Sequence, residues 1–143
     1  MQRTATAVWN GALKDGHGSI STQSGVLSDS PYSFVTRFEN AKGTNPEELI
    51  AAAHAGCFTM ALSAQLGTMN FTPQTLRTTA TLTLEKLEAG WTISKVHLDV
   101  TARVPGISAS AFESAAASAK ANCPVSRLLK AEITMNASLE QAA

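Results

Sequence analysis

The chain lacks several features that mark common classes of protein, beginning with any surplus of charge. Its 143 residues include 11 Lys and Arg and 11 Asp and Glu, which gives a formal net charge of zero. Neither sign gathers into a run, so the sequence has no basic patch of the kind that nucleic acids or anionic lipids need. We therefore expect no nucleic-acid partner.

Long apolar runs are also missing. No stretch reaches the roughly 18 uninterrupted apolar residues of a membrane-spanning helix, because His54, Thr59 and Ser63 break the longest candidate. Residues 1–9 alternate like a strand and lack the apolar stretch of a signal peptide.

The sequence has only 2 cysteines, and without an export signal they fit a reducing compartment, where permanent disulfides are disfavoured. We expect a cytoplasmic protein without a membrane partner.

The composition that is present favours one compact domain over residues 1–143. Hydrophobic residues make up 44% of the chain and charged residues 15%, which are globular values, and the length suits a single core. Between residues 5 and 38, short alternating segments at 6–9, 19–22 and 32–36 are separated by turn-forming residues. These segments predict an antiparallel meander of three strands.

A long helix is predicted from Pro46 to about Gly67. Asn45 is a favourable N-cap and Pro46 suits the first helical position. Apolar residues surround almost the whole helix, which is typical of a central helix rather than a surface helix.

The second half of the chain predicts a hairpin, two helices and a last strand. Residues 76–86 and 91–104 alternate around a turn at 88–90, and residues 96, 98, 100, 102 and 104 fall on one face. Ser108 caps a helix ending near Asn122, a short helix follows over 124–130, and a strand closes the chain at 133–139. The order predicts an α+β fold, with antiparallel sheets wrapped around the long central helix rather than a βαβ alternation.

The two thiols are the most reactive groups in the sequence, and each has two interpretations. Cys57 lies in the middle of the predicted long helix, where a thiol is usually an inert, buried, small hydrophobe. Cys123 lies directly before Pro124 at a helix start, where unpaired N–H groups favour a thiolate. From the residues alone, Cys123 is equally a reactive thiol or an adventitious cap.

A buried Cys57 becomes a nucleophile only if a cation lowers its pKa, and Arg37 is the candidate. Arg37 lies at the end of a predicted strand and needs a carboxylate partner, for which Glu47 or Glu48 is available. Glu47 lies about 15 Å along the helix from Cys57, so Arg37 must bridge the two or a second subunit must take part. Both acids could equally serve only to balance the helix dipole.

The sequence gives less support to a metal site or a cofactor site. His54 and Cys57 share a helix face and could bind a metal ion, but no third ligand stands at a recognisable spacing, so we expect no metal site. The sequence has no phosphate-binding glycine loop, nucleophile elbow or dinucleotide fingerprint, so we expect no cofactor. We interpret Ser126 as ordinary helix surface, and Trp9 and Trp91 as core or interface residues.

One segment of the chain closely resembles the signature of a known protein family. The segment Gly43–Phe58 resembles the signature of the OsmC proteins within the OsmC/Ohr family, and the similarity continues in order through residues 24–27, 32–39, 104–107 and 121–126. The resemblance implies an intertwined homodimer with two equivalent active sites at the subunit interface. It also implies a thiol peroxidase that reduces organic hydroperoxides to alcohols, and the apolar surroundings of Cys57 lead us to expect hydrogen peroxide to be reduced less well.

The resemblance also implies roles for individual residues. Cys57 resembles the peroxidatic thiol and Cys123 the resolving thiol, with Arg37 as the activating guanidinium and Glu47 as its carboxylate partner. Arg37 and Glu47 come either from the same chain or from the partner subunit. An external dithiol must reopen the Cys57–Cys123 disulfide, because the chain has no third cysteine. The alternative is a redox-sensing or small-molecule-binding dimer that uses the same thiols without turnover.

Overall fold

The computed structural model describes residues 1–140 and divides into two compact units, Met1–Leu49 and a second unit that begins at Ile50. Both units contain strands and helical residues, and the predicted α+β class is confirmed. The expectation of one domain over residues 1–143 remains a prediction, and residues 141–143 lie outside the described part of the chain.

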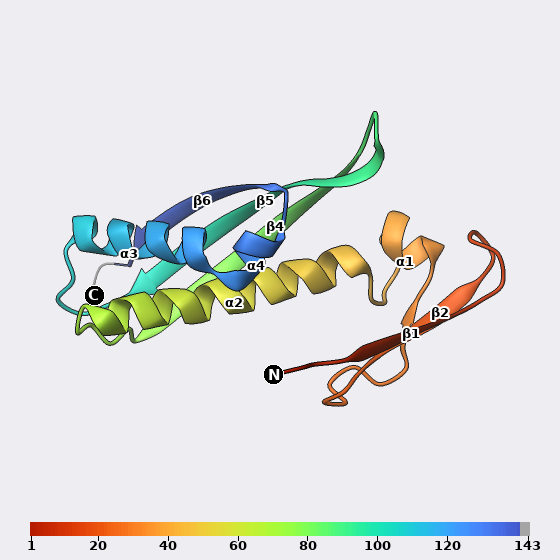
Figure 1. Ribbon diagram of the computed structural model, residues 1–143, viewed down its shortest axis with the longest axis horizontal. Helices are drawn as coiled ribbons and strands as arrows, with labels where there is room; N and C mark the ends of the chain where they lie inside the picture. Colours follow the sequence, from red (N-terminus) through yellow and green to blue (C-terminus); the bar gives the residue numbers. More distant parts are fainter. Residues whose placement is uncertain (141–143) are drawn as a thin grey trace. The chain divides into compact units, whose positions relative to one another are not determined.

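The first unit contains the predicted antiparallel meander. Its strands are β1 (Ala5–Asn10), β2 (His17–Thr22) and β3 (Ser30–Tyr32), paired in the order β1-β2-β3 (Figure 1). The rings of Trp9 and Tyr32 lie on this sheet with their centroids 5.3 Å apart. The unit therefore has an aromatic face built from its first and last strands.

The predicted strand over residues 32–36 is wrong beyond its first residue. β3 ends at Tyr32, and the helix α1 (Phe34–Phe38) follows. The backbone N–H of Ser33 donates to Thr36 Oγ1 at 2.8 Å, while Ser33 Oγ accepts from the Thr36 N–H at 3.4 Å. This reciprocal capping box starts a helix where the alternation of the sequence resembles a strand. Arg37 consequently lies in the last turn of a helix and not at the end of a strand.

The predicted long helix and its start are confirmed. Helix α2 spans Pro46–Thr68, and Asn45 Oδ1 accepts from the N–H of Glu48 at 2.8 Å, as expected for an N-cap. By length and composition α2 could also cross a membrane. However, a stripe of its residues at a spacing of one helical turn is buried in the second unit, as in the core helix of a globular protein. The stripe consists of His54, Phe58, Leu62 and Leu66.

The sheet of the second unit differs from the prediction in one strand. β4 (Thr75–Leu87) and β5 (Gly90–Arg103) form the predicted antiparallel hairpin, but β6 (Glu132–Leu139) runs parallel to β5. The helices α3 (Ala109–Asn122) and α4 (Pro124–Leu128) connect β5 to β6. Because they carry the chain back to the end of the sheet where β5 begins, β6 must run in the same direction as β5. The expectation of purely antiparallel sheets is therefore corrected.

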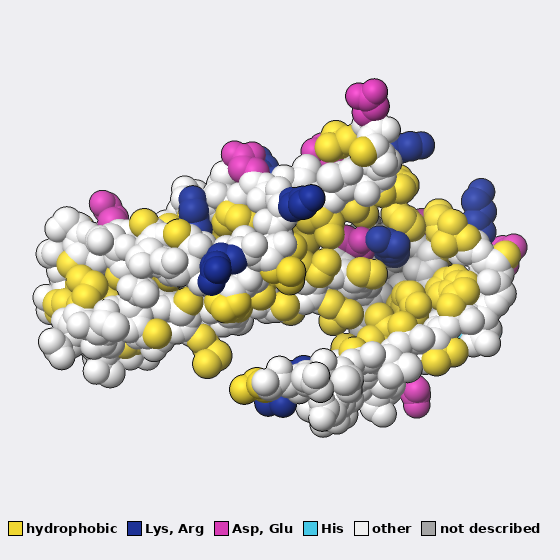
Figure 2. Space-filling model, viewed as in Figure 1, with side chains coloured by type: hydrophobic (Ala, Val, Ile, Leu, Met, Phe, Trp, Pro, Cys, Tyr) yellow, Lys and Arg dark blue, Asp and Glu magenta, His cyan; other side chains and the backbone are white. Residues whose placement is uncertain are grey.

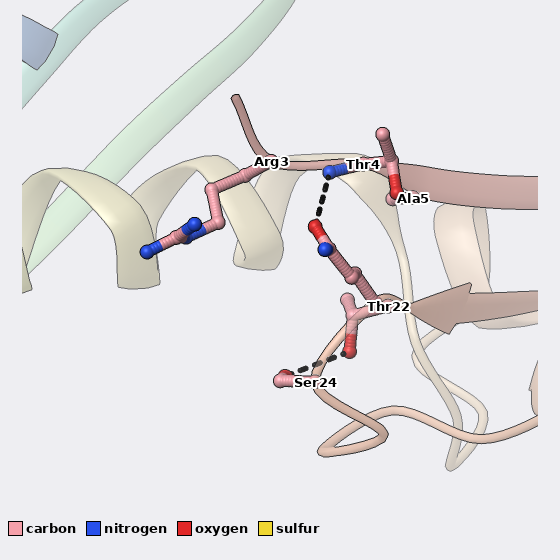
Figure 3. Close-up of a pocket in the computed structure, with 6 residues that line it drawn as sticks. Arg3, Thr4, Ala5, Thr22 and Ser24 are labelled. Atoms are coloured by element: carbon pink, nitrogen blue, oxygen red, sulfur yellow. Dashed lines mark hydrogen bonds between the residues drawn. The ribbon is translucent and has the colours of Figure 1, made fainter. Parts of the chain in front are cut away.

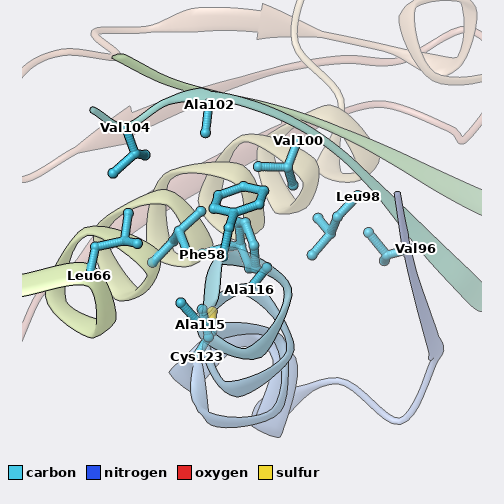
Figure 4. Close-up of a cluster of buried hydrophobic side chains, with 13 residues drawn as sticks. Phe58, Leu66, Val96, Leu98, Val100, Ala102, Val104, Ala115, Ala116 and Cys123 are labelled. Atoms are coloured by element: carbon cyan, nitrogen blue, oxygen red, sulfur yellow. The ribbon is translucent and has the colours of Figure 1, made fainter. Parts of the chain in front are cut away.

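The hydrophobic core lies entirely in the second unit. Figure 4 shows Phe58 and Leu66 from α2 facing side chains of β5 and α3. The face of β5 that the alternation predicts is buried, with Val96 and Leu98 at 0% exposure and Val104 at 7%. Within Met1–Leu49, by contrast, no hydrophobic side chain is buried. The first unit thus has no core of its own in this chain.

Candidate active site

The two cysteines meet between α2 and the start of α4. Both are free thiols, Cys57 partly buried in the middle of α2 and Cys123 fully buried at the junction of α3 and α4. The thiol of Cys57 is hydrogen-bonded to that of Cys123, and its sulfur also accepts from the backbone N–H of Val125. The structure therefore brings together the two thiols that the sequence analysis selected.

The surroundings of Cys57 in this unit hold its proton in place. Burial raises the pKa of the Cys57 thiol, and the hydrogen bond to Cys123 raises it further. The N–H of Val125 acts in the opposite direction, because it stabilises the thiolate. None of these influences is a positive charge. To react as a thiolate at neutral pH, Cys57 needs a cation from outside its immediate neighbours.

A second polar pair lies beside the cysteines. His54, which has no exposed surface, contacts Ser126 through Nε2 at 2.7 Å from the serine Oγ. Nδ1 of His54 has no partner within residues 1–140. Burial lowers the pKa of His54, so the ring is neutral at neutral pH. The interpretation of Ser126 as ordinary surface is wrong, because its hydroxyl is the polar anchor of a buried imidazole.

The metal interpretation of His54 and Cys57 finds no further ligand. Within the described residues, no group of three or more His, Cys, Asp or Glu side chains could hold a metal ion. Nε2 of His54 is already engaged by Ser126. The pair alone does not make a metal centre.

Arg37 and Glu47 form a bidentate ion pair within the first unit. Arg37 Nε donates to Glu47 Oε1 at 3.0 Å, and Arg37 Nη2 donates to the same oxygen at 2.7 Å. Glu47 is well covered, with 15% of its side chain exposed, against 38% for Arg37. The side chain of Glu48 makes no hydrogen bond within residues 1–140, so Glu47 is the acid that pairs with Arg37. The Nη1 group of Arg37 makes no hydrogen bond among the described residues, which leaves donors for another anion.

Two cavities lie in the first unit. One, of about 240 Å³, lies beside Arg37 and is lined by apolar and aromatic side chains that include Trp9, Leu13 and Phe34. The larger cavity, of about 690 Å³, lies between the start of β1 and the end of β2. Figure 3 shows that Arg3, Thr4 and Ser24 line it, and Arg3 is its only ionisable lining residue. Its lining contains no thiol, imidazole or carboxylate.

The chain is similar in sequence to known proteins over most of its length. Residues 39–138 match the family described as OsmC-like protein. The chain belongs to the OsmC family. It is 53% identical over 140 residues to a protein named Peroxiredoxin OsmC in Escherichia coli (strain K12), and the match covers 98% of each chain. A protein of the same name in Shigella flexneri matches equally well.

Solved structures show the same fold. The OsmC-like protein of Mycoplasma pneumoniae superposes with a TM-score of 0.78 at 16% identity, over 99% of both chains. The organic hydroperoxide resistance protein OhrB of Bacillus subtilis superposes with a TM-score of 0.67 at 23% identity, over 96% of this chain and 98% of the other. The OsmC fold is thus shared with proteins of low sequence identity.

Proposed function

We propose that this OsmC protein is a cysteine-based peroxidase that reduces organic hydroperoxides to alcohols. The observation that carries the proposal is the contact between the thiols of Cys57 and Cys123, contributed from two different helices. Two thiols in contact can form a disulfide with little movement of the backbone. The 53% identity to Peroxiredoxin OsmC of Escherichia coli supports the same chemistry.

The proposed cycle has three balanced steps. The Cys57 thiolate attacks the distal oxygen of the hydroperoxide, the O–O bond breaks, and the alcohol leaves after taking up a proton, so that Cys57 becomes a sulfenic acid. The thiol of Cys123 then attacks that sulfur, the S–S bond forms, the S–O bond breaks, and the oxygen departs as water. An external dithiol reduces the disulfide and is itself oxidised, which restores both thiols.

Arg37 supplies the cation that Cys57 needs in this scheme. Its guanidinium lowers the pKa of the thiol, and Glu47 holds the guanidinium in a fixed orientation through three hydrogen bonds. Pairing with Glu47 also offsets the cost of burying a charge next to a thiol. Because Arg37 and Cys57 belong to different units, the guanidinium comes either from the same chain or from a second copy.

We assign the protein as a homodimer. The first unit has no buried hydrophobic side chain, yet Val8, Leu13 and Val35 expose 50%, 68% and 40% of their surfaces. Figure 2 shows hydrophobic side chains grouped over the region of β1, β2 and α1. A segment of this composition is stabilised when another surface covers it, and a second copy of the chain is the natural cover.

The apolar cavity beside Arg37 supports a preference for organic hydroperoxides over hydrogen peroxide. An alkyl or aryl tail gains free energy from leaving water when it enters such a cavity, and hydrogen peroxide has no tail to bury. The need for an external dithiol fits a reducing cytoplasm.

Steady-state turnover of cumene hydroperoxide with a dithiol reductant tests the proposal. The native protein should complete many turnovers, more slowly with hydrogen peroxide, and the rates with thioredoxin, glutathione and lipoyl reductants should identify the electron donor. Cys57→Ser should abolish turnover. Consumption of a single equivalent of hydroperoxide would indicate a redox sensor instead, and full activity in Cys57→Ser would exclude the mechanism.

A further inference from the structure

The hydrogen bond between His54 and Ser126 connects the two helices that carry the cysteines. His54 lies three residues before Cys57 on α2, and Ser126 lies three residues after Cys123 on α4. In a helix such a spacing places both residues on one face. The 2.7 Å contact between His54 Nε2 and Ser126 Oγ therefore lies beside the contact between the two sulfurs.

Helix α4 has few other attachments. It contains only 5 residues, none of them is buried, and Cys123 gives it no side-chain cap. Within residues 1–140, Ser126 is the only residue of α4 whose side chain donates or accepts a hydrogen bond with another element. A helix this short is not stable by itself, so its position depends on its contacts.

The contacts between α2 and α4 differ in how they respond to oxidation. Two of them use the sulfur of Cys57, namely its hydrogen bonds with Cys123 and with the N–H of Val125. Both change when Cys57 becomes a sulfenic acid, because oxygen then occupies a position on that sulfur. The His54–Ser126 bond contains no sulfur, so oxidation of Cys57 changes neither of its two atoms.

We propose that His54 and Ser126 are positioning residues that keep Cys123 beside Cys57 after Cys57 has been oxidised. The inference rests on the proposed peroxidase function. It concerns the second step, in which the Cys123 thiol attacks the Cys57 sulfenic acid, the S–S bond forms, and the S–O oxygen leaves as water with the thiol proton. Holding two reacting groups together raises their effective concentration, so the bond accelerates this step. It leaves the earlier attack of Cys57 on the hydroperoxide unchanged, because Ser126 does not take part in that step.

A single-turnover experiment on the full chain separates the two steps. Reduced protein is mixed with one equivalent of cumene hydroperoxide, the loss of hydroperoxide gives the first rate, and mass spectrometry of quenched samples gives the rate of disulfide formation. Dimedone in a parallel reaction captures the sulfenic acid. In Ser126→Ala the first rate should stay within about twofold of the native rate, while disulfide formation should slow about tenfold, as expected for the loss of one buried hydrogen bond.

Ser126→Thr and Ser126→Val provide the matched comparison, because their side chains have the same shape and only threonine keeps the hydroxyl. Threonine should retain the native rate of disulfide formation, and valine should slow that rate and increase the dimedone adduct. This pair decides the question even if Ser126→Ala fails to fold, since a purely structural role would lower the melting temperature without changing the ratio of adduct to disulfide.

The possible outcomes separate failure of the positioning role from failure of the proposed peroxidase function. If native protein consumes no hydroperoxide, the proposed function fails. If native protein turns over but Ser126→Ala and Ser126→Val form the disulfide at the native rate, the positioning role is overturned and the peroxidase stands.

Discussion

We expect the unfolding free energy of the native protein to decrease as the pH falls below about 6.5. Replacing His54 with glutamine should make this decrease smaller. The folded protein buries this ring completely, and burial lowers its pKa from the ordinary value of 6.5. The unfolded chain therefore binds the proton first as the pH decreases. The stabilisation is complete above the pKa of the unfolded state and is lost as the pH falls towards the lowered pKa of the folded state.

The magnitude follows from proton linkage. Each proton bound only by the unfolded state lowers the unfolding free energy by up to about 1.4 kcal/mol per pH unit. Between about pH 6.5 and 5.5 the native protein should lose up to about 1 kcal/mol through His54. His54→Gln should not show this component, because an amide does not titrate and can still reach the Ser126 hydroxyl with a nitrogen or an oxygen.

Urea unfolding at several pH values measures this difference, with tryptophan fluorescence as the signal and a fixed concentration of reduced protein. The other ionisable groups are common to both proteins and cancel in the difference. His17→Gln is the matched control, because it makes the same substitution at an exposed residue on β2. Equal losses of stability in native protein and His54→Gln would refute the assignment of His54 as a neutral, buried ring.

Three further variants test other parts of the molecule. Cys123→Ser should still consume the first equivalent of hydroperoxide but accumulate a Cys57 sulfenic acid, which dimedone labelling would detect; rapid steady-state turnover would contradict a resolving role. Arg37→Ala should raise the pKa of Cys57 and slow the first turnover at pH 7, with the rate recovering at alkaline pH; an unchanged pH profile would remove Arg37 from the scheme. Phe58→Ala should lower the unfolding free energy by about 3–5 kcal/mol in urea, because Phe58 is fully buried, and a loss below 1 kcal/mol would mean that its site collapses around the smaller side chain.

Local signals in the sequence predicted the helices well. Asn45 and Pro46 define the start of α2 through contacts with the next few residues, and Ser108 does the same for α3 through its bond to the N–H of Ala111. The Ser33–Thr36 box is just as local, but threonine replaces the usual Glu or Gln at the third helical position. That substitution, within a segment that alternates like a strand, concealed α1.

Features that depend on distant parts of the chain were harder to predict. The direction of β6 follows from the path through α3 and α4, which the alternation of a strand does not encode. The bond between His54 and Ser126 joins residues that are 72 positions apart, and only the equal spacing of each from a cysteine could have suggested it. The residues alone offered Glu47 or Glu48 as the partner of Arg37, the resemblance to the OsmC proteins indicated Glu47, and the structure pairs Arg37 with Glu47.

Cys123 has no exposed surface, whereas Cys57 on the neighbouring helix is only partly covered. If the two sulfurs join as we propose, an incoming reductant would reach the bridge at Cys57, the partly covered sulfur. The mixed disulfide would then form on Cys57, and Cys123 would depart as the leaving thiol. The depth of each sulfur in the fold would thereby determine the order in which the bridge is opened and would exclude reductants too bulky to approach α2.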